Sequence, residues 1–143
     1  MSAPARRLDA LPDPLTVDLS IAAVRAAFGV ALFATPGLVI SVLAGGEARS
    51  PGAKLLARAA GVRDIAMAVS TVWALDRPAD LSRTSRLHAV VDATDAAAGV
   101  LAFKHLTPLG RTFALLGGSS SAAVGWLQSQ RWRERYGPQG SSA

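Results

Sequence analysis

The chain has 143 residues, of which 50% are hydrophobic, 17% are charged and only 6% are aromatic, and its net charge is +5. The lack of cysteine excludes disulfides, thiol nucleophiles and zinc–thiolate sites. The arginines lie at the ends of apolar segments rather than in a cluster with aromatic residues, which argues against nucleic acid as a partner. Long apolar segments with charged flanks are typical of integral membrane proteins.

Four apolar segments follow a polar stretch at 1–17, which predicts a flexible N-terminal tail. The segments cover about 19–43, 54–75, 86–103 and 112–128, and polar turns separate them. Pro36-Gly37 should kink the first segment or split off an amphipathic end, and Ser82 or Ser85 could cap the third. We therefore expect an all-α fold, with a four-transmembrane-helix bundle at 18–129 and a basic, disordered tail at 130–143.

The orientation follows from the basic residues, because four spans place both termini on one side of the membrane. Eight arginines lie on that side and five basic residues on the other, so the positive-inside rule predicts cytoplasmic termini in a bacterial inner (cytoplasmic) membrane. Trp73, Trp126 and Trp132 lie at the same ends, as in an interfacial aromatic belt. A soluble four-helix bundle stays open as an alternative, because the third and fourth segments are short for a span.

The third segment carries a polar stripe on an otherwise apolar helix. His88, Asp92 and Asp95 lie at i, i+4 and i+7, which places them on one face. With a rise of about 1.5 Å per residue, Arg25 of the first segment and Arg63-Asp64 of the second lie at neighbouring depths. Each charge in the middle of a bilayer costs about 2.5–3.5 kcal/mol on insertion scales, so these charges indicate a use. We expect Arg63 to pair with an aspartate of the third segment.

Simpler interpretations of these residues stay open. Arg63 with one aspartate could be a buried ion pair that fixes helix register, Arg25 could extend to the headgroups, and His88 could be a solvated or capping residue. A metal site at Asp92 and Asp95 would lack a Glu-x-x-His pattern and a second imidazole in the spans, so no metal or other cofactor is expected.

Small residues recur at four-residue spacing in the fourth segment, at Gly117, Ser121 and Gly125. Such a face allows two helix backbones to approach closely. Packing against the third segment and a homodimer interface are both compatible with it. Ser119 to Ser121 could also form hydrogen bonds into the polar cavity.

The chain resembles a family of small four-helix integral membrane proteins that is common in actinobacteria and fungi and whose function is mostly unknown. The resemblance covers about 21–132 and lies in Ala57-Arg-Ala-Ala-Gly-Val-Arg-Asp64, Asp92-Ala-Thr-Asp95, Arg25 and Pro36-Gly37. Some fungal members are associated with polyether pathways as candidate epoxide hydrolases, and the resemblance implies the same chemistry here.

We therefore expect a membrane-embedded enzyme that performs acid–base chemistry on a lipophilic small molecule, with epoxide opening or hydrolysis as the leading reaction. Asp92 and Asp95 are the expected catalytic pair, Arg63 orients them, and Asp64 is the alternative acid. Arg25, His88 and Ser121 are the expected substrate-binding residues. An Asp–Arg–Asp arrangement resembles soluble limonene-epoxide hydrolases on a different fold.

Two functions from other classes compete with this one. The same carboxylates could relay protons in a small proton-coupled transporter or channel. Alternatively, the charges could be assembly contacts of a non-catalytic subunit in a larger membrane complex. Membrane lipid and a lipophilic substrate are the expected partners, with a homodimer as a further possibility.

Overall fold

The computed structural model describes residues 12–46 and 50–136, and over these ranges every regular element is a helix. The elements are α2 (Pro14–Ala34), α3 (Pro36–Ala44), α4 (Pro51–Ala74), α5 (Pro78–Leu101), η2 (Phe103–His105), α6 (Pro108–Thr112), η3 (Phe113–Gly117) and α7 (Gly118–Tyr136). The turn η3 is a π-helix. The last three elements follow without a break, so they form one helical rod. The predicted all-α class is confirmed.

Proline marks the start of α2 and of each of the four α-helices that follow it, up to α6. Its fixed φ suits the first helical position, where a backbone N–H would have no partner in the helix. Asp13, Ser50 and Thr107 precede three of these prolines and accept hydrogen bonds from backbone N–H groups of the first turn. The expected cap at Ser82 or Ser85 is wrong, because α5 already begins at Pro78.

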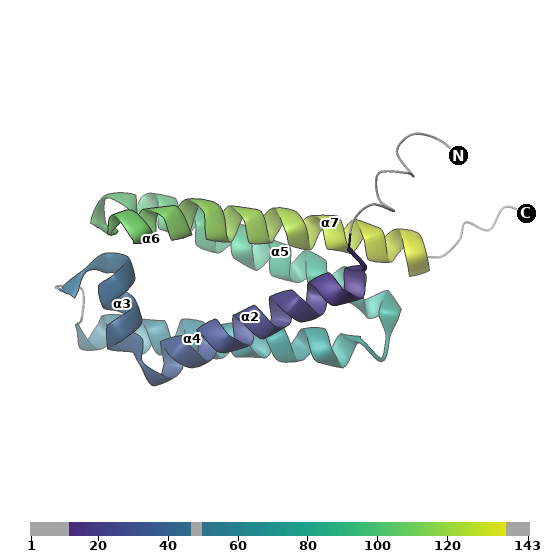
Figure 1. Cartoon of the computed structure of the whole chain (residues 1–143), viewed down its shortest axis with the longest axis horizontal. Coiled ribbons are helices and arrows are strands. Elements are labelled where there is room, and N and C mark those ends of the chain that lie inside the picture. Colours follow the sequence, from purple (N-terminus) through teal and green to yellow (C-terminus); the bar gives the residue numbers. More distant parts are fainter. Residues whose placement is uncertain (1–11, 47–49, 137–143) are drawn as a thin grey trace, which may run out of the picture.

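The first apolar segment is divided at Thr35, between α2 and α3. Pro36 cannot donate the backbone hydrogen bond that would continue α2, so α3 leaves in a new direction (Figure 1). Of the two outcomes expected at Pro36-Gly37, a kink or a separate end, the structure has a separate helix, α3.

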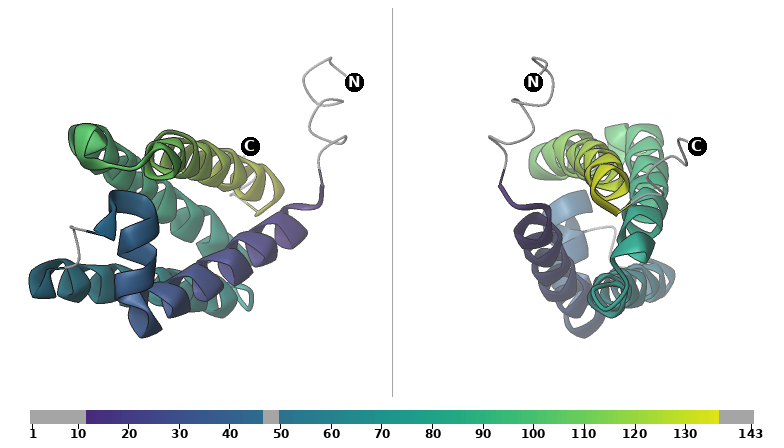
Figure 2. Two further views of the ribbon diagram at one scale, coloured as in Figure 1. Left: turned by 60° about the vertical axis from the view of Figure 1, so that its left-hand side comes forward. Right: turned by 90° about the vertical axis from the view of Figure 1, so that its right-hand side faces the viewer.

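The four long helical segments pack as two antiparallel pairs, α2 with α4 and α5 with α7 (Figures 1 and 2). Gly29 and Gly61 allow the first pair to approach closely, because a Cβ on either would lie within 2.7 Å of the other's carbonyl oxygen. In the second pair, Gly118 lies against Ala96 and Gly125 lies against Ala89. Both pairs therefore depend on backbone contact at glycine.

The small-residue face of α7 differs from the predicted one at one position. Gly117 has only the ring of Phe113, one turn away, near its Cβ position, whereas Gly118 contacts α5. The π turn η3 places one more residue in the turn than an α-helix does, and this shifts the register of the residues that face α5. Gly125 packs within the chain, and a homodimer through Gly117, Ser121 and Gly125 stays a prediction.

The two pairs meet at both ends of the bundle. At one end Thr107 donates a backbone hydrogen bond of 3.0 Å to the carbonyl oxygen of Leu43, and the rings of Phe28 and Phe113 lie 5.2 Å apart. At the other end Trp132 is buried with Ala74 and Leu81. The region between these ends contains the charged residues described below.

The described part of the expected C-terminal tail is helical. Residues 130–136 continue α7, and Arg131 and Trp132 are buried. The basic composition predicts a tail, but Trp132 packs against Ala74 and Leu81 and donates its indole N–H to Asp18, and Arg131 donates a hydrogen bond to the carbonyl oxygen of Pro12. Residues 1–11 and 137–143 of the two expected tails lie outside the described residues.

Large apolar side chains lie mainly on the outside of the molecule. Leu101 is 85% exposed, Leu56 72% and Val24 69%, while the buried set includes Asp18, Asp92 and Gln128. Among the described helices, only α2 is long and apolar enough by itself to cross a bilayer.

Candidate functional site

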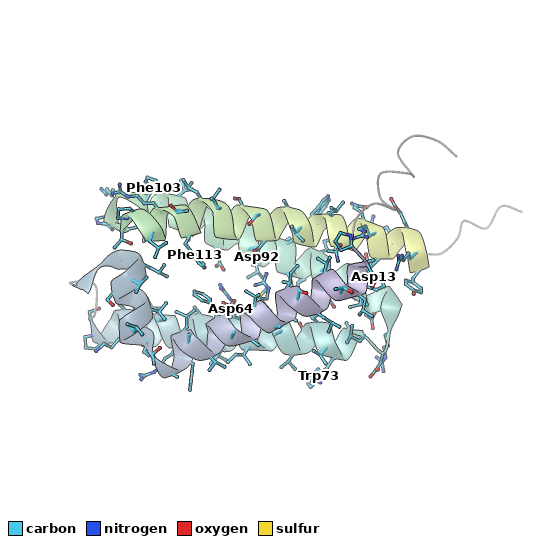
Figure 3. All side chains as sticks on the ribbon, in the orientation of Figure 1. Asp13, Asp64, Trp73, Asp92, Phe103 and Phe113 are labelled. Carbon is cyan, nitrogen blue, oxygen red and sulfur yellow. The ribbon has the colours of Figure 1, made fainter. Side chains whose placement is uncertain are left out.

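Five charged side chains from three helices form one connected ion cluster between the two helix pairs. Arg25 of α2 contacts Asp92 of α5 and lies 3.8 Å from Asp64 of α4. Arg63 of α4 lies 3.3 Å from Asp64 and binds Asp95 of α5 with both terminal nitrogens, at 2.7 and 2.6 Å. The order of contacts is therefore Asp92–Arg25–Asp64–Arg63–Asp95. Asp64 and Asp92 lie on facing sides of the two pairs (Figure 3).

This geometry confirms the prediction that Arg63 pairs with an aspartate of the third apolar segment. The partner is Asp95, while Asp92 pairs with Arg25. Arg25 therefore does not extend to the surface, and its side chain is only 12% exposed. The cluster links α2 and α4 to α5 in the part of the bundle where the pairs are otherwise separated.

The three carboxylates of the cluster are held differently. Asp95 has a two-pronged contact with Arg63, and Asp92 has a close contact with Arg25. Asp64 has only the longer contacts of 3.3 and 3.8 Å, although its side chain is just 9% exposed. Two arginines and three aspartates leave one negative charge in excess. Because the other two carboxylates each have a close arginine, Asp64 is the carboxylate in excess.

Access to the cluster is uneven. The side chains of Arg63 and Asp95 are 39% and 40% exposed, whereas those of Asp64 and Asp92 are below 10%. The Nε atoms of Arg25 and Arg63 are buried and have no hydrogen-bond partner among the described residues. A buried donor without an acceptor is costly, so an oxygen atom of a ligand or water would be favoured there.

His88 lies beside the cluster rather than in it. Its Nε2 is 3.0 Å from the hydroxyl oxygen of Ser70, and the same hydroxyl donates its single hydrogen to the carbonyl oxygen of Met67 at 2.8 Å. The Ser70 oxygen must then accept, so Nε2 of His88 carries the hydrogen. His88 is buried and is not the solvated residue that one interpretation of the sequence allowed.

Ser121, the remaining predicted substrate-binding residue, is half-buried on α7. It lines a groove against α2. Its neighbours Ser119 and Ser120 donate their hydroxyl hydrogens to carbonyl oxygens of the preceding turn, at Leu115 and Leu116.

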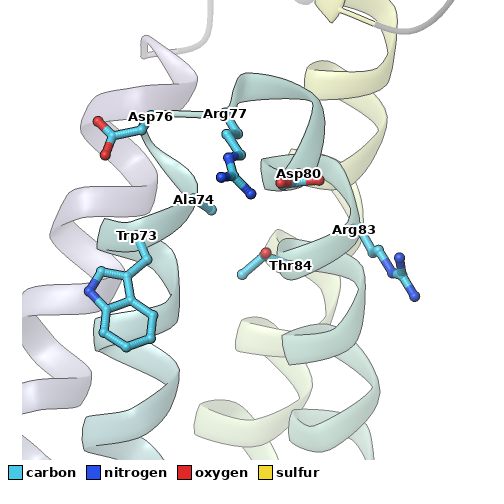
Figure 4. Close-up of a pocket in the computed structure, with 7 residues that line it drawn as sticks. All are labelled: Trp73, Ala74, Asp76, Arg77, Asp80, Arg83 and Thr84. Atoms are coloured by element: carbon cyan, nitrogen blue, oxygen red, sulfur yellow. The ribbon is translucent and has the colours of Figure 1, made fainter.

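A cavity of about 560 Å³ lies at the turn between α4 and α5, at the end of the bundle and separate from the cluster (Figure 4). Its walls carry exposed charged residues, and they include Trp73, Asp76, Arg77, Asp80, Arg83 and Thr84. None of these charged side chains forms an ion pair with another described residue. The cavity is shallow and polar, as expected for the end of a helical hairpin.

A second polar network was not predicted from the sequence. Asp18 accepts hydrogen bonds from the indole N–H of Trp132 and from Gln128, and Arg131 binds Gln128 and the carbonyl oxygen of Pro12. The expected aromatic belt is therefore wrong for Trp132, which is buried, while Trp73 and Trp126 are exposed. The signal in the sequence was Gln128, a long amide four residues before Trp132, on the same helical face.

Over residues 12–46 and 50–136, no group of three histidine or acidic side chains is placed to hold a metal ion. No protein-family model, curated protein or solved structure matches the chain. The arguments for its function therefore come from the chemistry of its own residues.

Proposed function

We propose that the chain is an integral membrane protein whose four long helical segments, α2, α4, α5 and the α6–η3–α7 rod, cross the bilayer. The distribution of side chains supports this. Exposed Val, Leu, Phe and Trp residues occur on all four segments, and ion pairs and amides lie inside. In water such a surface would be an aggregation hazard, whereas in lipid it is the outer face of a bundle.

The charges of α4 and α5 are the reason why composition alone identifies only α2 as a span. Both helices have 24 residues, which exceeds the ~20 needed to cross the hydrocarbon core. Arg63, Asp64, Asp92 and Asp95 lower their mean hydropathy, but these residues pair with one another inside the bundle. Paired intramembrane charges of this type mark functional sites in membrane proteins.

The arginine bias supports cytoplasmic termini. Reporter fusions that end at Gly46 and at Asp76 should then face opposite sides of the membrane, with Gly46 outside and Asp76 in the cytoplasm. The same side for both reporters would contradict the four-span topology. Retention of the protein in the soluble fraction after cell lysis would contradict membrane insertion itself.

We propose that the cluster catalyses acid–base chemistry on a lipophilic small molecule, with hydrolysis of an epoxide to a vicinal diol as the reaction. The observation that carries this is the excess carboxylate. In a low-dielectric bundle, three carboxylates that share two arginines favour the retention of one proton, so the cluster supplies a carboxylic acid beside carboxylates. Opening an epoxide with water needs this combination of one acid and one base.

The contacts support the following roles for these residues in the proposed reaction. Asp64 is the acid, because it is the excess carboxylate, and Asp95 is the base, because its side chain is 40% exposed and that of Asp64 only 9%. Arg63 contacts both and fixes their separation. This Asp64–Arg63–Asp95 order resembles the Asp–Arg–Asp arrangement noted above. In this assignment Asp64 takes the place of Asp92 in the catalytic pair expected from the sequence. Asp92 instead holds Arg25 in position.

In the proposed step, Asp95 takes a proton from water while the water oxygen forms a bond to an epoxide carbon. The C–O bond of the ring breaks, and its oxygen receives the proton of Asp64. The product is a vicinal diol with one oxygen from water, and transfer of the proton from Asp95 back to Asp64 restores the site.

The test is turnover of lipophilic epoxides by the purified protein in lipid nanodiscs, in water enriched in ¹⁸O. We expect one ¹⁸O atom per diol in the first turnover, and a fall of kcat/KM by about 10²- to 10⁴-fold in Asp95→Asn. Asp80→Asn, an exposed aspartate on the same helix, is the matched control. No diol from a panel of alkyl, aryl and terpene epoxides would overturn the proposal, and proton flux in empty proteoliposomes would favour a carrier instead.

A further inference from the structure

A groove of about 410 Å³ lies between α2 and α7, outside the ion cluster. Its volume lies within the ~300–1,000 Å³ typical of small-molecule sites. The two helices lie side by side over their halves nearest the described ends of the chain (Figure 1). The walls combine aliphatic side chains and hydroxyls, and they include Val17, Ser20, Ile21, Ser120, Ser121 and Val124.

The inner end of this groove reaches the level of the charged residues. On α2, Ile21 is one turn before Arg25 on the same face. On α7, the contacts of Gly118 with Ala96 and of Gly125 with Ala89 set an antiparallel register against α5. This register puts Ser121 at the level of Asp92 and Ala93. The groove therefore runs from the first turn of α2 to Ile21 and Ser121, one helical turn before Arg25 and at the level of Asp92 along the bundle.

Ser121 differs from the two serines before it. Ser119 and Ser120 use their hydroxyl hydrogens within α7, but the hydroxyl of half-buried Ser121 has no hydrogen-bond partner among the described residues. A hydroxyl can donate one hydrogen bond and accept two. At the inner end of a mainly aliphatic groove, it is suited to meet the single oxygen of an otherwise hydrocarbon ligand.

We infer that this groove binds the hydrocarbon part of the lipophilic substrate and that Ser121 binds an oxygen of that substrate beside Arg25. The inference rests on the proposed function for the identity of the substrate. The aliphatic walls accept an alkyl or terpenoid chain, and the hydroxyl of Ser121, at the end of the groove that lies one turn from Arg25, would hold the oxygen-bearing end of the chain near the cluster. The open side of the groove faces the proposed lipid phase, so the substrate enters laterally from the membrane.

The lack of cysteine in the chain provides a test of binding that does not depend on turnover. Ser121→Cys places a thiol in the groove, and Ala123→Cys places a matched thiol on the exposed side of α7. The rate of labelling by N-ethylmaleimide is measured in nanodiscs with and without dodecyl methyl ether, which has an alkyl chain and one oxygen but no reactive ring. We expect labelling at position 121 to slow by at least about threefold and labelling at position 123 to be unchanged.

Two outcomes of the labelling overturn the inference. Equal rates at position 121 with and without the ether show that the groove does not bind it. Equal protection by dodecane, which has no oxygen, shows a site for any hydrocarbon chain, such as a lipid acyl chain.

Turnover separates this inference from the proposed reaction. If the ether protects position 121 but the wild-type protein hydrolyses no epoxide, binding in the groove is supported and the proposed reaction is refuted. If the wild-type protein is active, Ser121→Phe should raise KM by about tenfold or more relative to Ala123→Phe, because it fills the groove. Equal KM values in the two variants, when both have the Tm of the wild type, would refute substrate binding in the groove and leave the proposed reaction unaffected.

Discussion

Asp64 and Asp92 are both buried aspartates in one cluster, yet their arginines hold them differently. Asp92 is in close contact with Arg25, while Asp64 has two arginines at 3.3 and 3.8 Å and no closer donor. We assign the proton of the cluster to Asp64 on this ground. Substitution of Asp64 and substitution of Asp92 should therefore change the stability of the protein by different amounts.

We expect Asp64→Asn to leave the Tm within a few degrees of the wild-type value, because it replaces one neutral group by another of the same shape. Asp92→Asn should instead lower the free energy of unfolding by about 1–3 kcal/mol, since it takes the close partner from a buried arginine. Both Tm values are measured in the same detergent. A larger loss in Asp64→Asn than in Asp92→Asn would show that Asp64 is ionised in the resting protein.

Activity gives the complementary result at the same residues. Asp64→Asn cannot donate a proton to the epoxide oxygen, so its turnover should fall by about 10²- to 10⁴-fold while its Tm is retained. The ratio of activity to folded protein is the quantity to measure. A scaffold role for Asp64 predicts activity in proportion to the folded fraction.

The helices of this protein are placed by contacts that only glycine permits. Gly110 of α6 is the tightest case, because a Cβ there would lie 1.9 Å from the carbonyl oxygen of Leu43 in α3. That carbonyl also accepts the backbone hydrogen bond and the hydroxyl of Thr107. The contact joins the two helix pairs at the end of the bundle opposite the termini.

We expect Gly110→Ala to destabilise the fold by about 1–3 kcal/mol, since the overlap is with backbone and cannot be relieved by a side-chain rotation. Gly52→Ala is the matched control, because Gly52 is also in the first turn of a helix and has no atom within 4 Å of its Cβ position. That change should be neutral or stabilising by up to about 1 kcal/mol. Equal Tm values for the two variants would contradict the α3–α6 contact.

At the scale of the whole molecule, the end of α7 is joined to the start of α2. Asp13 caps α2 and forms an ion pair of 3.0 Å with Arg135. Asp18, Gln128 and Trp132 continue this connection in the interior. The first and last long helices are thereby held together, which closes the end of the groove.

The hydrogen bond from Arg135 lowers the pKa of the Asp13 carboxyl below its ordinary value. A group with a lowered pKa in the folded state stabilises the fold above its unfolded pKa of ~3.9, and this stabilisation is lost as the pH falls through the folded value. We therefore expect Asp13→Asn, which keeps the helix cap, to be less stable than the wild type at pH 6, with the difference shrinking as the pH falls below the unfolded pKa of ~3.9. Melting curves of the two proteins across this range test the prediction, and a constant difference at all pH values would contradict it.

Much of the fold could be predicted because its signals are local. Apolar runs separated by polar turns predict helices, and the division near Pro36 follows from the missing N–H of proline. The helices α2, α4 and α5 begin three to eight residues before the apolar segments, because each starts at a proline in the polar stretch that precedes its apolar residues. The meeting of two arginines with three aspartates also followed from helix rise and segment length.

The partners within the cluster could not be predicted in this way. The sequence by itself determined that α2, α4 and α5 carry charges at similar heights along the bundle, since a helix rises by a constant amount per residue. Only the tertiary structure decided that Arg63 binds Asp95 and that Asp64 is left in excess, because the rotation of each helix about its axis depends on packing against its neighbours. The same holds for Gly118, which replaces Gly117 after the π turn, and for Trp132, whose burial depends on Asp18, more than 100 residues away in the chain.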